Sequence, residues 1–300
     1  MFDLMKKIIC LLFITHFSFS QVMPSFHGVH HKKSSTATDF SQMGSDIDGE
    51  AIGDMSGRAV SLSSDGTIVA IGAYSNDVNG TSSGHVRVYS WNGSAWVQRG
   101  SDIDGEAVLD YFGYSVSLNS DGTIVAIGGY GNDGGGNSSG HVRVYTWNGS
   151  VWVQRGSDIN GEANNDLSGW SLSLISDGTI VAIGARSNDG RGPNSGHVRV
   201  YTWNGSVWVQ RGSDIDGEAA NDGSGNSVSL SSDGNIVAIG ARYNDGGGNS
   251  SGHVRVYEWN SGSSSWVQKG NDIDGEAPGD NSGRSVSLSS DGNIVSIGAY

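Results

Sequence analysis

Cysteine, proline and basic residues are scarce in this sequence. The single cysteine is Cys10, so no disulfide framework is expected in the rest of the chain, even in an oxidising compartment. Only 3 prolines occur in 300 residues, which excludes a collagen-like chain and a proline-rich linker. The 17 Lys and Arg face 31 Asp and Glu. The resulting net charge of -14 argues against nucleic acid and anionic membrane surfaces as partners and favours cations or basic surfaces.

Long hydrophobic runs are absent after the first 20 residues. Lys6 and Lys7 precede an apolar run over 8–17, and serines follow at positions 18 and 20. This pattern predicts a signal peptide over 1–20, and therefore a secreted protein or one on the extracellular surface. The run is shorter than the roughly 20 apolar residues that a membrane helix needs. No membrane span is therefore expected beyond the signal peptide.

Glycine, in contrast, is abundant, with 48 residues, and it marks a repeat. The phrase GSDIDGEA, or a close variant, recurs at intervals of 56, 56, 56 and 58 residues, beginning at Gly44, Gly100, Gly156, Gly212 and Gly270. Self-similarity at a fixed period indicates a repeat architecture. The predicted organisation is a leader over 21–43, complete units over 44–99, 100–155, 156–211 and 212–269, and a partial unit over 270–300. The segment 39–44 resembles the last strand of each unit and is a candidate outer strand for closing a ring.

The first predicted hairpin of a unit is apolar on both faces. In the first unit, a Ser-Asp-Gly turn joins apolar runs over 59–63 and 67–73. Asp-Gly between such runs is a strong hairpin signal, and a central Asp-Gly pair places Leu62 opposite Val69. Because neither face carries a charge, we expect this hairpin to be buried on both sides.

The second predicted hairpin joins residues 85–91 to 95–99 through Asn-Gly-Ser. A central Asn-Gly pair would place Tyr89 opposite Trp96. Four strands in each unit of about 56 residues predict an all-β fold, a β-propeller of four-stranded antiparallel blades. A β-solenoid is the alternative, but its coils are shorter and wind in parallel, without two tight hairpins per repeat.

Short glycine-containing phrases flank the first hairpin of each unit. The second unit has Phe112-Gly113 before the hairpin and Gly128-Gly129-Tyr130 after it, and serine replaces the aromatic residue at 56, 168, 224 and 282. With the SGHVRVY phrase that follows, the unit resembles the FG-GAP repeat of integrin-α-like propellers. The resemblance covers 44–300 and implies a seven-bladed propeller used outside the cell for binding. Seven blades would need more residues than this sequence has, so a truncated part of a larger propeller is expected.

An acidic loop of the pattern D-I-D-G-E-A-x-x-x-D opens every unit. Its carboxylates suit Ca²⁺, which takes about six to eight oxygen ligands. The alternative is that Asp and Asn fold the loops through side-chain-to-backbone hydrogen bonds, and Asn160 in place of an aspartate favours it. The calcium loop of integrin-type blades does not carry over, because it lies in the first hairpin, which is only a Ser-Asp-Gly turn here. The candidate calcium ligands are Asp46, Asp48, Glu50, Asp54, Asp102, Asp104, Glu106, Asp110, Asp158, Glu162, Asp166, Asp214, Asp216, Glu218, Asp222, Asp272, Asp274, Glu276 and Asp280.

No nucleophile motif, phosphate loop or zinc spacing occurs, so no catalytic residue is assigned. One histidine recurs at the start of the third strand, in a different blade each time, and structural roles are expected for His85, His141, His197 and His253. The repeated surface predicts a non-enzymatic propeller for extracellular binding or adhesion, with a protein or glycan ligand and with calcium as a candidate stabilising ion. The alternative is the non-catalytic propeller of a larger secreted enzyme, such as a polysaccharide-degrading protein.

Overall fold

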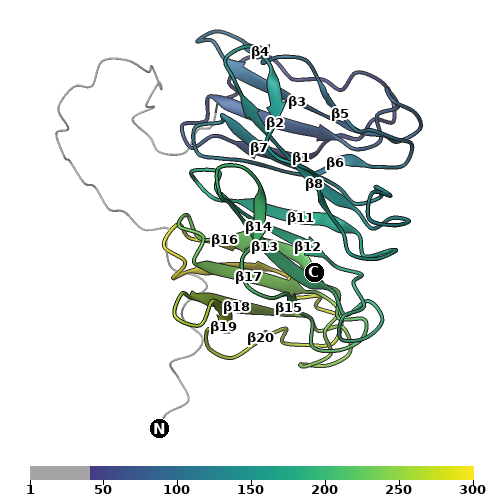
Figure 1. Ribbon diagram of the computed structural model, residues 1–300, viewed down its shortest axis with the longest axis vertical. Helices are drawn as coiled ribbons and strands as arrows, with labels where there is room; N and C mark the ends of the chain where they lie inside the picture. Colours follow the sequence, from purple (N-terminus) through teal and green to yellow (C-terminus); the bar gives the residue numbers. More distant parts are fainter. Residues whose placement is uncertain (1–40) are drawn as a thin grey trace, which may run out of the picture. The chain divides into compact units, whose positions relative to one another are not determined.

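The computed structural model describes residues 41–300 (Figure 1). The predicted signal peptide and most of the predicted leader lie outside the described residues. Every regular element from residue 41 onward is a β-strand. Within this part of the chain, no helix has the length and hydropathy needed to cross a membrane.

Four sheets of one topology follow one another along the chain (Figure 1). The first contains β1 (Ser56–Leu62), β2 (Ile68–Ala73), β3 (His85–Trp91) and β4 (Trp96–Gln98), each antiparallel to the next, with β5 (Ile103–Asp104) also paired to β3. The next three sheets repeat this order. The second contains β6 (Phe112–Leu118), β7 (Ile124–Gly129), β8 (His141–Trp147), β9 (Trp152–Gln154) and β10 (Ile159–Asn160), and the third contains β11 (Ser168–Leu174), β12 (Ile180–Ala185), β13 (His197–Trp203), β14 (Trp208–Gln210) and β15 (Ile215–Asp216). The fourth contains β16 (Ser224–Leu230), β17 (Ile236–Ala241), β18 (His253–Asn260), β19 (Ser265–Gln268) and β20 (Ile273–Asp274). A hairpin of β21 (Ser285–Leu288) and β22 (Val295–Gly298) follows.

The outermost strand of each sheet is interrupted. In the first sheet, β4 pairs with residues 89–91 of β3, and β5 pairs with His85 and Val86 on the same edge. The two short strands are therefore halves of one outer strand. The break contains Gly100, with a φ of +82°, where a Cβ would meet the ring of Trp147 in the next sheet. With β4 and β5 counted together, the predicted four-stranded antiparallel blades are confirmed.

The apolar core lies between successive blades. Between the first two, Val86 and Val88 of β3 pack in one cluster with Ile127 of β7. The second strands β7, β12 and β17 are buried along their whole length, so the predicted burial on both faces holds for this half of the hairpin, whereas β1 has exposed residues. The serines of the first strands also link blades, since the Oγ of Ser61 accepts a 2.9 Å hydrogen bond from the N–H of Leu118.

The sheets of the described residues do not close into a ring. The innermost strands β1, β6, β11, β16 and β21 lie side by side in this order. On the outer face of the first sheet, Val60 is 61% exposed and Leu62 is 59% exposed, whereas the equivalent Leu118 of the second sheet is 6% exposed. Each blade therefore needs a neighbour on both faces to bury its apolar side chains.

The first hairpin has the predicted register. Leu62 lies opposite Val69, as the sequence indicated. The turn differs from the expected Asp-Gly pair, because only Gly66 has a positive φ, of 70°. Asp65 instead accepts hydrogen bonds from the Ser63 hydroxyl and from the N–H of Thr67, at 2.7 and 2.9 Å.

The predicted register of the second hairpin is wrong. Tyr89 lies opposite Gln98, and Trp96 lies opposite Trp91, with ring centroids 5.5 Å apart. The reason is the side chain of Asn92, whose Oδ1 accepts 2.9 Å hydrogen bonds from the backbone N–H groups of residues 94 and 95. This produces a four-residue loop in place of a two-residue turn and shifts the pairing.

Candidate functional site

The last aspartate of each acidic loop holds the loop together, and in the first four loops it is buried. Asp110 is 2% exposed, and its Oδ2 accepts the N–H groups of Glu106 and Ala107 at 3.0 and 2.9 Å. Its Oδ1 accepts a 3.2 Å hydrogen bond from Asn132 in the loop after the second strand. Equivalent backbone bonds hold Asp54, Asp166, Asp222 and Asp280. These aspartates stabilise the loop through side-chain-to-backbone hydrogen bonds, as turn residues do.

Three other side chains meet where consecutive units adjoin. The Nδ1 of His141 in β8 lies 3.6 Å from Oδ2 of Asp158, and Glu106 completes a group whose ligand atoms all lie within 4.8 Å of one another. Glu106 and Asp158 belong to two successive acidic loops. The four groups are Glu50, His85 and Asp102; Glu106, His141 and Asp158; Glu162, His197 and Asp214; and Glu218, His253 and Asp272. The described residues therefore contain acidic and histidine groups that could hold a metal ion, one histidine in each.

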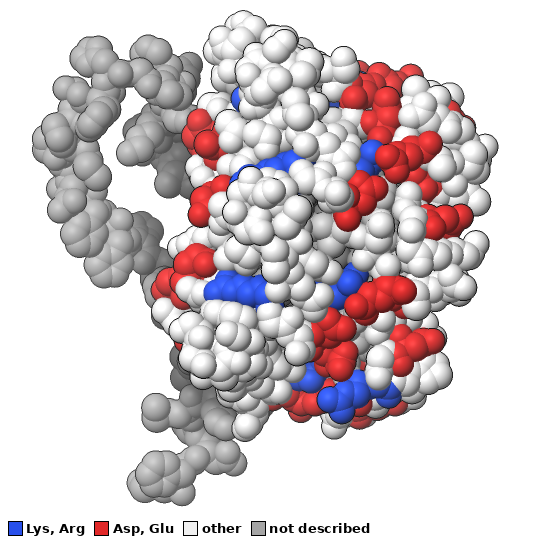
Figure 2. All heavy atoms as spheres, viewed as in Figure 1, with Lys and Arg blue, Asp and Glu red and all other residues white. Residues whose placement is uncertain are grey.

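The predicted calcium ligands of one loop contact different residues and do not surround one point. In the first loop, the backbone carbonyl of Asp48 accepts a 2.6 Å hydrogen bond from Arg87 Nη2, and Glu50 Oε1 lies 3.6 Å from Arg87 Nη1. Figure 2 shows acidic side chains in successive clusters along the visible face, with basic side chains beside them. The structure assembles carboxylates from two loops around a histidine, rather than the four of one loop around one point. Calcium binding by these loops stays a prediction.

A cavity of about 890 Å³ runs along the innermost strands. Each of the first four inner strands is bulged near its start, and in β6 the register shifts between Phe112 and Ser115. Gly113 in this bulge has a φ of +88°. A bulge re-aims the side chain that it carries. The residues after the bulge glycine line the cavity and differ between units: Arg58, Tyr114, Trp170, Asn226 and Arg284.

Aromatic rings and guanidinium groups pack together at this cavity. The ring centroid of Tyr114 lies 4.6 Å from those of Tyr130 and Trp170. The guanidinium carbon of Arg58 lies 4.9 Å from the Tyr114 centroid, and that of Arg186 lies 3.6 Å from the Trp170 centroid. Burial, reinforced by the neighbouring tyrosines, raises the pKa of Tyr130 to about 12. Its phenol is therefore uncharged at neutral pH.

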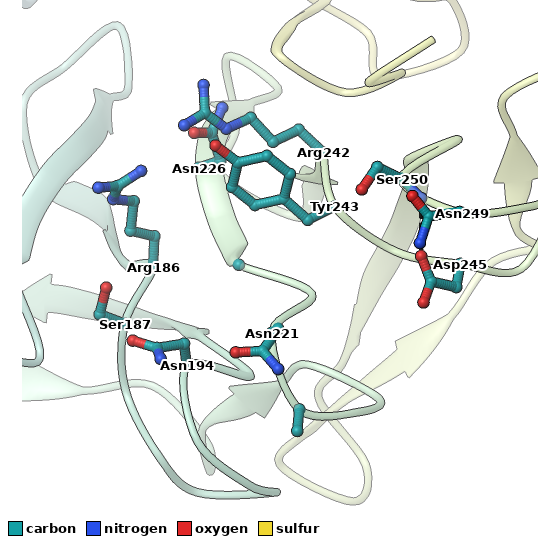
Figure 3. Close-up of a pocket in the computed structure, with 12 residues that line it drawn as sticks. Arg186, Ser187, Asn194, Asn221, Asn226, Arg242, Tyr243, Asp245, Asn249 and Ser250 are labelled. Carbon is teal, nitrogen blue, oxygen red and sulfur yellow. Dashed lines mark hydrogen bonds between the residues drawn. The ribbon is translucent and has the colours of Figure 1, made fainter. Parts of the chain in front are cut away.

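A second cavity, of about 530 Å³, shares Asn226 and Arg242 with the first (Figure 3). Arg186 and Arg242 follow the second strands of adjacent blades, and in both the Nε atom is buried without a hydrogen-bond partner. Figure 3 shows both side chains extending toward the same side of the cavity, with Tyr243 beside Arg242. Burial, followed by the charge of Arg242, lowers the pKa of Arg186, but an arginine remains charged at neutral pH. Two cationic side chains therefore line one polar cavity, which makes it suited to an anion.

No family model matches this chain, and no curated protein matches it. Among solved structures, the periplasmic gluconolactonase of Pseudomonas aeruginosa is similar with a TM-score of 0.54 and 14% identity, covering 80% of this chain and 64% of that one. The hydrazine synthase of Kuenenia stuttgartiensis has a TM-score of 0.50 and 13% identity, covering 80% of this chain and 60% of that one. A Bacteroides uniformis protein provisionally described as a 6-phosphogluconolactonase has a TM-score of 0.49 and 10% identity, covering 80% and 57%.

These similarities support the propeller fold and correct the predicted function. The chain spans 57–64% of the length of the solved structures that it matches. Similarity at this level of identity shows the fold. The gluconolactonase and the hydrazine synthase carry the names of enzymes, which contradicts the prediction of a non-enzymatic propeller for extracellular binding or adhesion.

The sequence predictions did not include the residues of the two cavities, because those predictions rest on positions that are the same in every unit. Their signal is variation at fixed positions of the unit. One such position lies after the bulge glycine, and the other lies after the second strand, where the residues are Tyr74, Tyr130, Arg186, Arg242 and Tyr300. Since structural positions repeat and a binding site need not, positions that vary within an otherwise constant repeat are the candidates for a site.

Proposed function

We propose that the two adjoining cavities form the substrate site of an enzyme that acts on a small sugar-derived acid or its lactone. The observation that carries this proposal is the pair Arg186 and Arg242, which line one polar cavity and whose buried Nε atoms have no hydrogen-bond partner. Arginine binds carboxylates through two parallel hydrogen bonds, which fixes the orientation of the ligand as well as its affinity.

The chemistry of a lactone fits the same residues. Water attack on a lactone carbonyl places negative charge on its oxygen, and a preorganised guanidinium stabilises that charge. Asp245 is the carboxylate that lines the second cavity, and it is the candidate base for the attacking water. Trp170 and Tyr114 supply apolar ring faces against which the carbons of a sugar ring can pack.

The fold comparison supplies the first substrate to test. The periplasmic gluconolactonase of Pseudomonas aeruginosa is named for a sugar lactone, and this chain has the same kind of fold. We therefore expect the protein to accelerate the hydrolysis of glucono-lactone and to bind gluconate.

Hydrolysis followed by acid release at constant pH, with gluconate binding by calorimetry, tests the proposal. Replacing Arg186 or Arg242 by alanine should lower kcat/KM about 30-fold or more, because a charge-assisted hydrogen bond of about 2 kcal/mol is lost. Arg191→Ala is the matched control, since Arg191 is exposed, pairs with Asp216 and lies outside both cavities. The proposal would be overturned if the unmodified protein showed no hydrolysis and no binding of gluconate.

We also propose export through the signal peptide over 1–20, a relationship to FG-GAP propellers, and divalent cation binding by the acidic loops. Calcium is the ion that the carboxylates of the loops predict. The histidine that the structure adds to each group is a nitrogen donor, and nitrogen changes the expected ion. Recovery of the processed protein from the culture medium or cell surface tests the export.

A further inference from the structure

We propose that each junction between consecutive units is a binding site for a divalent transition-metal ion, with Zn²⁺ as the expected ion. One glutamate, one histidine and one aspartate would hold it. The inference is independent of the enzymatic proposal, because none of these residues lines the two cavities of the substrate site.

The distances at the first junction are slightly longer than those between two ligands of one zinc ion. Nδ1 of His85 lies 3.8 Å from Oε2 of Glu50 and 3.7 Å from Oδ2 of Asp102. These separations are too long for hydrogen bonds. Two ligands bound to zinc at roughly 2.0–2.2 Å lie roughly 3.4 Å apart at a tetrahedral angle, so each carboxylate oxygen lies within a few tenths of an ångström of the separation from the histidine that a shared ion needs.

The remaining carboxylate oxygens are already held by other residues. Oδ1 of Asp102 accepts a 2.6 Å hydrogen bond from Gln98, which leaves Oδ2 toward the histidine. Oε1 of Glu50 faces Arg87, which leaves Oε2 toward the histidine. The glutamine bond recurs from Gln154 to Asp158, from Gln210 to Asp214 and from Gln268 to Asp272. Partners that orient ligands in this way are typical of metal sites.

The histidines of three groups provide an independent observation that favours a bound ligand. His85, His141 and His253 are no more than 1% exposed, and both ring nitrogens of each lack a hydrogen-bond partner. An unpaired buried polar group costs about 1–3 kcal/mol. A bound ion would satisfy Nδ1. The neutral imidazole is the form that binds metal.

The donor set favours a transition metal over calcium. Imidazole is a preferred ligand of zinc, whereas Ca²⁺ takes about six to eight oxygen ligands. Three protein ligands leave positions for water, and the carboxylates are exposed enough for an ion to enter, with Glu50 at 45% and Asp102 at 26%.

The four junctions differ in the residue that lies opposite the histidine. A third carboxylate lies across from the histidine in three of them: Asp104 opposite His85, Asp216 opposite His197 and Asp274 opposite His253. Oδ1 of Asp104 is buried without a hydrogen-bond partner. In the second junction Asn160 takes this place, opposite His141. We therefore expect the second junction to bind its ion most weakly.

Metal titration of the chelator-treated protein tests the inference. Zn²⁺ should bind to a total of four ions per chain by calorimetry and elemental analysis, one for each group. Replacing His85 by glutamine should remove one ion and leave the other sites intact, and Asn160→Asp should tighten the weakest site about tenfold. Co²⁺ in place of Zn²⁺ should give visible absorption that falls by about a quarter in the His85→Gln protein.

Two controls separate this result from other zinc binding. A variant with His27, His30 and His31 replaced by asparagine tests the leader and should keep all four ions, as should Asp177→Asn in an exposed turn. Circular dichroism of each variant checks that the sheets are retained. Less than one ion per folded chain, an unchanged count in His85→Gln, or a rise in melting temperature with Ca²⁺ equal to that with Zn²⁺ would overturn the inference.

Discussion

The indole Nε1 of Trp152 donates a 2.7 Å hydrogen bond to the backbone carbonyl of Arg99. Trp152 belongs to the outer hairpin of the second blade, and Arg99 follows the outer strand of the first. The same bond joins Trp208 to Arg155 and Trp266 to Arg211, and Trp96 makes it to Met43. The second tryptophan of each outer hairpin therefore ties its blade to the segment that precedes it.

Replacing Trp152 by phenylalanine should lower the free energy of unfolding by about 0.5–1.5 kcal/mol, because the ring packing is largely kept while the hydrogen bond is lost. Val153→Ala, in the same strand at a site that is 47% exposed, should change it by less than about 0.5 kcal/mol. Urea unfolding of both variants makes the measurement. Equal effects of the two substitutions would contradict the role given to the indole.

Ser168→Ala should stabilise the protein. The Ser168 side chain is fully buried, and its hydroxyl has no hydrogen-bond partner. Removing an unsatisfied buried hydroxyl should raise the free energy of unfolding by about 1 kcal/mol. In the same strand, Ser171 donates a 2.8 Å hydrogen bond to the carbonyl of Gly225, so Ser171→Ala should have the opposite sign. A lower melting temperature for Ser168→Ala would show that the hydroxyl has a partner.

Gly128→Ala should destabilise the protein because blades approach closely at this position. A Cβ at Gly128 would overlap the carbonyl oxygen of Gly169 in the next blade and the hydroxyl of Ser115. Overpacking of this kind typically costs about 1–3 kcal/mol. Gly262→Ala is the matched control, since a Cβ there meets only the Asn260 side chain, at 3.3 Å. Thermal melts of the two variants that coincide would contradict the close approach of the blades.

The hairpin aspartates should make stability fall in acid. Hydrogen bonds from Ser289, followed by those from Asn293, lower the pKa of Asp291 to about 2. The unfolded chain has a value near 3.9, so it binds more protons than the folded chain between about pH 2 and pH 4. The contribution of Asp291 is therefore present above about pH 4 and is lost as the pH falls toward 2.

Melting temperatures between pH 2 and pH 5 test this expectation. Asp291→Asn should flatten the pH dependence in this range, and Ser289→Ala should flatten it less, because only one of the hydrogen bonds is lost. An unchanged slope in Asp291→Asn would remove this aspartate from the acid response.

The predictions from sequence succeeded where a short segment decides its own conformation. Leu62 lies opposite Val69 because the turn between them spans only a few residues and the apolar alternation allows one register. The same reasoning failed for Tyr89 and Trp96, since the Asn92 side chain lengthens the loop by bonding its backbone. An Asn-Gly sequence permits both a two-residue turn and a four-residue loop, and the sequence alone does not distinguish between them.

The candidate sites also combine residues that the sequence indicated with contacts that it did not. The acidic loops and the recurring histidine were visible in the sequence, but Glu106, His141 and Asp158 are spread over 53 residues, from 106 to 158. Only the stacking of blades brings them together. Likewise, Arg186 and Trp170 are in contact because a bulge and a strand end bring them together.

By itself, the sequence determined the period of the repeat, the all-β class and the four strands of a blade, because turn chemistry and the alternation of apolar residues act over a few neighbouring positions. Only the tertiary structure decided which polar side chains share a site. Those contacts join residues from different loops and different blades, and their distances depend on how sheets pack, on where Gly113 bends its strand and on how closely Gly128 lets the next blade approach.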